Sequence, residues 1–125
     1  MRENIKKILP PYYAVIFTSV RTPGDNDYSK MAVQMEELAS LQSGYLGHDS
    51  ARESVGITVS YWEDLESIRK WKMQLDHLEA QEAGRNQWYK SYTVRISKVE
   101  REYSFEMGPN NNRTKGTSKQ LRLLD

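Results

Sequence analysis

The hydrophobic pattern of the chain predicts four strands, because β-branched and aromatic residues are concentrated in four separate segments. Tyr12 to Val20 (YYAVIFTSV) is the densest of them and is typical of a strand. Gly44 to Arg52 is weaker because Gly47 interrupts it, and Val55 to Trp62 is stronger. The link at Glu53-Ser54 is short enough to make those two segments a hairpin.

The fourth strand is predicted over Tyr92 to Phe105, where apolar residues alternate with polar ones. The alternation shifts by one position between Ile96 and Val99. Such a shift indicates either a β-bulge or a strand that changes its buried face midway.

Two further segments repeat apolar residues at steps of three and four, which predicts amphipathic helices. Pro23-Gly24 marks the turn before the first helix, Asp25, Asn26 or Asp27 can cap its start, and Gly44 can close its end. Asp64 can cap the second helix, which runs towards Gly84. The apolar stripes are Tyr28, Met31, Ala32, Met35, Leu38 and Ala39 in the first helix, and Leu65, Ile68, Trp71, Leu75 and Leu78 in the second.

The order β-α-β-β-α-β predicts a ferredoxin-like α+β fold, with both helices on one face of a four-stranded antiparallel sheet. Residues 12–106 form this domain, residues 1–11 extend it, and residues 107–125 are expected to be a disordered tail with a charge of +3. In the first strand both alternating sets, Tyr13-Val15-Phe17 and Tyr12-Ala14-Ile16, are apolar. Two helices cover only one face, so we expect the sheet of a second copy to cover the other in a homodimer. Tail residues folding back are the alternative.

Composition excludes several classes of protein. The 125 residues contain no cysteine, which rules out disulfides and thiolate chemistry and fits a cytoplasmic protein. The net charge of +1 argues against a nucleic-acid partner. No apolar run is long enough to cross a membrane, and the N-terminus lacks the apolar stretch of a signal peptide.

The common catalytic and phosphate-binding motifs are absent, and the two histidines, His48 and His77, lack metal-ligand spacing. Aromatic residues gather instead around the second helix, with His77, Gln81 and Arg85 at four-residue steps among them. A polar row beside large rings can line a pocket for a flat ligand. For Trp71 and Trp88, each taken alone, core packing is the simpler interpretation. The aromatic set is Tyr61, Trp62, Trp71, Trp88, Tyr89 and Tyr92.

From Tyr12 to Phe105 the chain resembles the antibiotic-biosynthesis-monooxygenase (ABM) family, most of all its YqjZ-like bacterial branch. The resemblance rests on Gly44 to His48, Ile57 to Asp64, Ile68, Trp71, His77-Leu78, Ala80-Gln81, Gly84-Arg85, Trp88-Tyr89 and Tyr92. It implies a dimeric α+β barrel with a pocket between the helices and the sheet in each subunit. Some members of the family oxidise aromatic compounds with O2, without metal or flavin.

A heme-degrading branch of the family uses a strand-1 asparagine, a helix-2 tryptophan and a histidine ten residues after it. The tryptophan matches Trp71, but the histidine position holds Gln81 and the asparagine position falls near Thr18 or Ser19. Glutamine is a poor iron ligand, so heme is disfavoured. His77 lies only about 40° around the helix from Gln81, which leaves a shifted ligand conceivable.

The favoured hypothesis is therefore a cofactor-independent monooxygenase for a small aromatic or quinol-like compound. A non-enzymatic dimeric ligand-binding or stress protein is the alternative, and a heme protein comes third. No metal is expected. The candidate catalytic residues, which would stabilise a substrate anion, are Trp71, His77, Arg85 and His48, and the candidate substrate-binding residues are Tyr61, Trp62, Gln81, Trp88, Tyr92 and Thr18.

Overall fold

The computed structural model describes residues 9–81 and 88–108, which contain four strands and two helices in the predicted order. One sheet holds all four strands, in the spatial order β2-β3-β1-β4, with antiparallel pairing throughout. The elements are β1 (Tyr12–Arg21), α1 (Tyr28–Ser40), β2 (Tyr45–Arg52), β3 (Gly56–Trp62), α2 (Leu65–Gln81) and β4 (Tyr89–Val99). The α+β, ferredoxin-like prediction is thereby confirmed.

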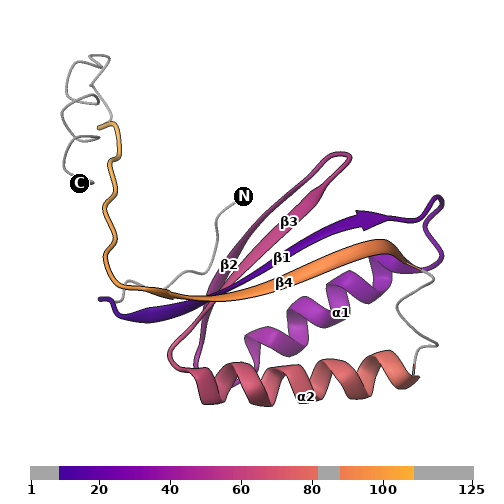
Figure 1. Ribbon diagram of the computed structural model, residues 1–125, viewed down its shortest axis with the longest axis horizontal. Coiled ribbons are helices and arrows are strands. Elements are labelled where there is room, and N and C mark those ends of the chain that lie inside the picture. The colour runs from indigo at the N-terminus through magenta and orange to yellow at the C-terminus, as the bar shows by residue number, and fades with distance from the viewer. Residues whose placement is uncertain (1–8, 82–87, 109–125) are drawn as a thin grey trace.

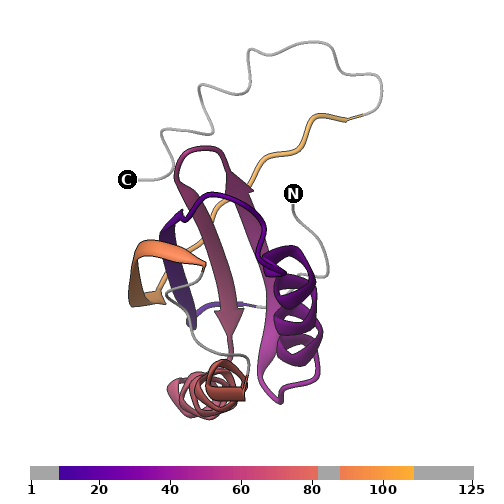
Figure 2. The same ribbon diagram turned by 90° about the vertical axis from the view of Figure 1, so that its right-hand side faces the viewer.

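Both helices lie on the same side of the sheet (Figure 1). The view turned by 90° shows the opposite side of the sheet without a helix (Figure 2). A single sheet therefore has one helix-covered face and one helix-free face, as the sequence predicted. Among the residues that the structure describes, no helix is long and apolar enough to cross a membrane.

The core of the domain forms between the helix-covered face and the helices. Trp62 is completely buried and packs with Ala39, Ile68 and Trp71, and its ring stacks on that of Trp71 with centroids 6.2 Å apart. Trp62 lies opposite Tyr13 in the sheet register, and strand alternation places Tyr13, Val15 and Phe17 on this same face.

Each helix starts at an aspartate that accepts hydrogen bonds from the first turn. The backbone N–H of Ser67 donates to Asp64 Oδ1 at 2.8 Å, which confirms the predicted cap of α2. At α1, the Ser29 hydroxyl donates to Asp25 Oδ1 at 2.6 Å. Asp27, next to the helix, makes no side-chain cap.

The last strand is shorter than predicted. β4 ends at Val99, where its pairing with β1 reaches Tyr12, and residues 100–108 continue as an extended arm without strand pairing. No bulge separates Ile96 from Val99. The bulge alternative is therefore wrong. The apolar positions do change face, because Ile96 lies on the helix-covered face and Val99 on the helix-free face, but Ile96 is 53% exposed and Val99 only half-buried.

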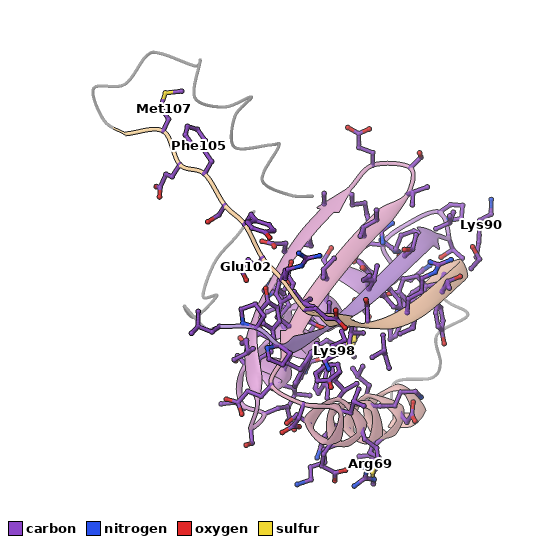
Figure 3. All side chains as sticks on the ribbon, turned by 60° about the vertical axis from the view of Figure 1, so that its left-hand side comes forward. Arg69, Lys90, Lys98, Glu102, Phe105 and Met107 are labelled. Carbon is purple, nitrogen blue, oxygen red and sulfur yellow. The ribbon has the colours of Figure 1, made fainter. Side chains whose placement is uncertain are left out.

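The arm leads away from the sheet, and Phe105 and Met107 stand clear of it (Figure 3). At its base the Tyr12 hydroxyl donates a hydrogen bond to Glu102. In the sequence of the arm, polar residues alternate with large apolar ones from position 102 onward: Glu102, Ser104 and Glu106 alternate with Tyr103, Phe105 and Met107. Of the predicted tail, residues 109–125 lie outside the described residues, as do residues 1–8 of the predicted N-terminal extension.

Candidate functional site

A cavity of about 510 Å³ opens between the helix-covered face of the sheet and the two helices. Its walls are mostly apolar and aromatic, with a few polar side chains, which is typical of sites for small organic molecules. The apolar lining is Val15, Phe17, Tyr28, Ala32, Met35, Ala39, Tyr45, Ala51, Ile57, Ile68, Trp71, Leu75, Tyr89, Tyr92, Val94 and Ile96. The polar lining is Glu36, His48, Ser50, Arg52, Thr58, Ser60, Lys72 and Asp76.

An irregularity in β2 brings a phenol and an imidazole together at one end of the cavity. Tyr45 lies opposite Trp62, but the next pair along is Gly47 with Tyr61, so Leu46 is an extra residue between them. Gly47 has a φ of +139°, which favours glycine. Because of the extra residue, Tyr45 and His48 share a face, and Tyr45 Oη lies 2.7 Å from His48 Nδ1.

The other nitrogen of the same imidazole faces a carboxylate. His48 Nε2 lies 3.7 Å from Glu36 Oε2 of α1, and the His48 side chain is only 14 % exposed. The carboxylate, imidazole and phenol thus form a row. Such a row favours proton transfer, because Glu36 stabilises the imidazolium that forms when His48 accepts a proton.

Four aromatic rings form the opposite end of the cavity. Phe17 lies 5.4 Å from Tyr89 and 5.2 Å from Tyr92 between ring centroids, and Tyr28 meets Tyr89 edge-on at 5.8 Å. Burial raises the pKa of the Tyr89 phenol far above its usual value, and a hydrogen bond with Tyr28 raises it further. Tyr89 is therefore neutral at physiological pH and contributes a flat wall with a hydrogen-bonding edge.

Three of the candidate residues from the sequence line the cavity, namely Trp71, His48 and Tyr92. Thr18 and Tyr61 do not. Thr18 alternates with Phe17 and Ser19 and points to the helix-free face. Tyr61 lies on that face too, where it donates a hydrogen bond to Asp49 at 2.9 Å.

The remaining candidates are structural, exposed or outside the described part. Trp62 and Trp88 are buried and do not line the cavity; the indole N–H of Trp88 donates to the Asn26 carbonyl at 3.0 Å. His77 is exposed on α2 and does not line the cavity either. The side chain of Gln81 and the whole of Arg85 lie outside the described residues.

The structure adds Glu36, Tyr45, Arg52, Tyr28 and Tyr89 to the cavity. Of these, the sequence singled out only Tyr89, as part of the aromatic set. Gly47 inside a predicted strand was the one available sign that β2 is irregular, because a glycine within a strand often marks a bulge.

The described residues give heme no suitable ligand on α2. Position 81 is a glutamine, and His77 is exposed away from the cavity lining. His48 does reach the cavity, but both of its ring nitrogens face protein groups. No group of three or more histidine, aspartate or glutamate side chains suited to a metal ion occurs in residues 9–81 and 88–108.

Comparisons with known proteins identify the family and the fold. No family model matches the chain. It is 47% identical over 103 residues to the uncharacterised protein YqjZ of Bacillus subtilis, covering 81% of this chain and 90% of YqjZ.

Solved structures share the fold at low identity. SnoaB, a cofactor-independent oxygenase from Streptomyces nogalater, superposes with a TM-score of 0.57 at 12% identity, over 76% of this chain and 97% of SnoaB. A candidate antibiotic biosynthesis monooxygenase from Bordetella bronchiseptica gives 0.56 at 16% identity, over 70% and 96% of the two chains. The chain therefore belongs to the YqjZ family, and its fold is that of the antibiotic biosynthesis monooxygenases.

Proposed function

We propose that the cavity binds a small aromatic or quinol-like compound and that the protein oxidises it with O2 as a cofactor-independent monooxygenase. The observation that carries the proposal is the row of Glu36, His48 and Tyr45 at the end of an aromatic cavity. The shared fold with SnoaB, a cofactor-independent oxygenase, supports the same reaction class.

The reaction needs a substrate anion, because an electron-rich carbon must give an electron to O2. His48 accepts the proton of the substrate hydroxyl through the Tyr45 phenol, and Glu36 stabilises the resulting imidazolium. The substrate radical and superoxide then combine at carbon, and the hydroperoxide loses water. One oxygen atom stays in the quinone and the other leaves as water, with both hydrogens of that water coming from the substrate. Trp71 forms a wall that keeps water from the anion.

An oxygen electrode with a panel of anthrols and quinols tests the proposal. We expect at least one compound to consume O2, and His48→Gln to lower the rate by about 10²- to 10⁴-fold because the proton acceptor is lost. Trp71→Ala should also lower the rate. Arg69→Gln is the control, since Arg69 lies on the side of α2 away from the sheet and pairs with Glu66 (Figure 3).

A wild-type rate no faster than that of the variants, over the whole panel, would replace the oxygenase with a binding-only protein. The same panel with His77→Gln decides between the two histidines of the chain. A loss confined to His77→Gln would move the proton acceptor to α2. Arg85, the remaining candidate, stays a prediction.

We further propose that two copies pair through their helix-free sheet faces. That face carries Ala14, Ile16, Val59 and the edge-to-face pair of Tyr12 and Tyr61, with centroids 6.0 Å apart. Tyr12 and Ala14 are buried within the single chain, whereas Ile16, Val59 and Tyr61 remain partly exposed, and covering this apolar face further favours an isologous dimer. Size exclusion with light scattering at micromolar concentration should give twice the chain mass of 14.6 kDa. The mass of a single chain would contradict the pairing.

A further inference from the structure

The cavity has a second polar end, at the β2–β3 hairpin, which the proposed reaction does not use. Arg52, the last residue of β2, lines the cavity there and donates a hydrogen bond from Nη2 to Ser19 Oγ. Ser19 is only 1 % exposed, so the guanidinium is held by a fixed group. Arg52 lies four positions after His48 in the strand, which puts their Cα atoms about 13 Å apart on the same face.

The backbone makes room for this guanidinium. A Cβ atom built on Gly56 would lie 2.1 Å from both Cζ and Nη2 of Arg52, so the arginine head rests directly over the glycine. Any side chain at position 56 would displace it. The arrangement orients the guanidinium and leaves most of its five N–H donors unused by Ser19.

Among the residues that the structure describes, Arg52 has no acidic neighbour at the cavity. The cavity's two described carboxylates already face other side chains: Glu36 lies beside His48, and Asp76 accepts from Lys72 at 3.0 Å. Among residues 9–81 and 88–108, no ion pair involves Arg52. A second cation, Arg21, stacks on the Tyr28 ring with its Cζ 3.6 Å from the centroid. Within the described part of the chain, Arg52 gives this end of the cavity a positive charge, with the rings of Phe17 and Tyr89 beside it.

We propose that Arg52 binds an anionic group, a carboxylate, at one end of the aromatic ligand whose hydroxyl lies at Tyr45 and His48. The substrate class is thus a hydroxylated aromatic acid, long enough to span the cavity. The planar fork of a guanidinium matches a carboxylate in a bidentate pair, and its position over Gly56 orients that fork. This inference rests on the proposed function, because it assumes that the cavity holds the aromatic ligand.

Two probes of the same ring size test it, 6-hydroxy-2-naphthoate and 2-naphthol, which differ only in the carboxylate. Binding is measured by calorimetry and by quenching of tryptophan fluorescence, since Trp71 lines the cavity. We expect the wild-type protein to bind the naphthoate about ten- to a hundredfold more tightly than the naphthol. Added salt should narrow this difference.

Two variants remove the anchor by different routes. Arg52→Gln removes the positive charge. Gly56→Ala keeps the arginine and its charge but moves the guanidinium away from its position over residue 56. Both should abolish the preference for the naphthoate and leave the affinity for 2-naphthol unchanged. Arg52→Lys should retain part of the preference for the naphthoate, because lysine keeps the positive charge but lacks the planar, two-donor geometry of the guanidinium. Arg95→Gln is the matched control, since Arg95 pairs with Ile16 and lies on the helix-free face.

The outcomes separate this inference from the proposed function. Wild-type protein that binds both probes equally overturns the carboxylate anchor and leaves the aromatic cavity standing. A preference that survives in both Arg52→Gln and Gly56→Ala also overturns it, because another group then holds the carboxylate. Wild-type protein that binds neither probe overturns the proposed function together with the anchor. If Arg52→Gln fails to fold, Gly56→Ala and Arg52→Lys decide the matter.

Discussion

The two faces of this sheet carry similar residues and differ in what they leave open. On the helix-covered face, Val15 and Phe17 border a cavity, with charged groups at both of its ends. On the helix-free face, Ala14 and Ile16 of the same strand lie in a surface without a described cavity. The difference teaches that apolar content alone does not mark a site. The helices on one face hold a space open, whereas the other face offers surface for another sheet.

The largest expected effect tests whether the helix-covered face holds the domain together. Trp62→Ala should lower the free energy of unfolding by about 3–5 kcal/mol, because Trp62 is completely buried in the core cluster. Val59→Ala, on the helix-free face, should cost about 1 kcal/mol. Urea denaturation at low protein concentration measures both. Equal costs would mean that the two faces are equally packed in one chain.

The next effect tests the use of the helix-free face. Ile16→Glu should weaken the dimer at least about tenfold, because pairing would take two added carboxylates out of water, a cost that the cross-strand Arg95 offsets only in part. Size exclusion with light scattering over a dilution series measures the dissociation constant. Val33→Glu, on an exposed position of α1, is the control. If Ile16→Glu stays as dimeric as that control, the pairing uses another surface.

A smaller effect concerns the helix that covers the cavity. Asp64→Ala should lower the melting temperature by a few degrees, because the Ser67 backbone N–H loses its acceptor. That hydrogen bond holds the pKa of Asp64 below its usual value, so the contribution is present at neutral pH and is lost as the pH falls through that lowered pKa. Asp64→Asn should keep the cap and lose the pH dependence. Identical acid profiles of wild type and Asp64→Asn would contradict the assignment.

The smallest expected effect is a loss of folding stability at alkaline pH, and it depends on Tyr89. Burial and the hydrogen bond with Tyr28 raise the pKa of Tyr89, so the unfolded chain releases this proton at a lower pH than the folded protein. Stability should therefore fall as the pH rises above about 10, the ordinary tyrosine value. Tyr89→Phe should make this fall shallower, which urea unfolding between pH 9 and pH 11 can measure. Parallel curves would show that Tyr89 titrates normally.

The periodicity of the sequence was sufficient to predict the fold, because each element presents a clear apolar stripe or alternation. The predicted end of the last strand, Phe105, was wrong for a physical reason, since β4 ends at Val99. Alternation continues from Val99 into the arm, but a strand also needs a partner, and β1 starts at Tyr12 opposite Val99. Pro10 and Pro11 precede it and have no backbone N–H to donate to further pairing.

The site was harder to predict. Most of the candidate residues were chosen because they lie near α2 in the sequence, but several of them do not line the cavity. Tyr61 and Trp62 were both assigned to the ligand, yet neighbours on a strand point to opposite faces. Tyr45 and His48, three positions apart, would lie on opposite faces of a regular strand, and only the extra residue unites them. Arg52 depends on Gly56, a contact across the hairpin that no pattern in the sequence announces.

The extra residue at Leu46 has an evolutionary consequence. Deleting it would leave Tyr45 and His48 two positions apart, and in a regular strand two such residues share a face, so the phenol and the imidazole would still lie together. What the shorter strand would no longer need is the φ of +139° at Gly47, because that angle accompanies the irregular register. Descendants of a common ancestor should therefore keep or lose the extra residue together with the glycine, while the phenol and the imidazole can be retained in either case.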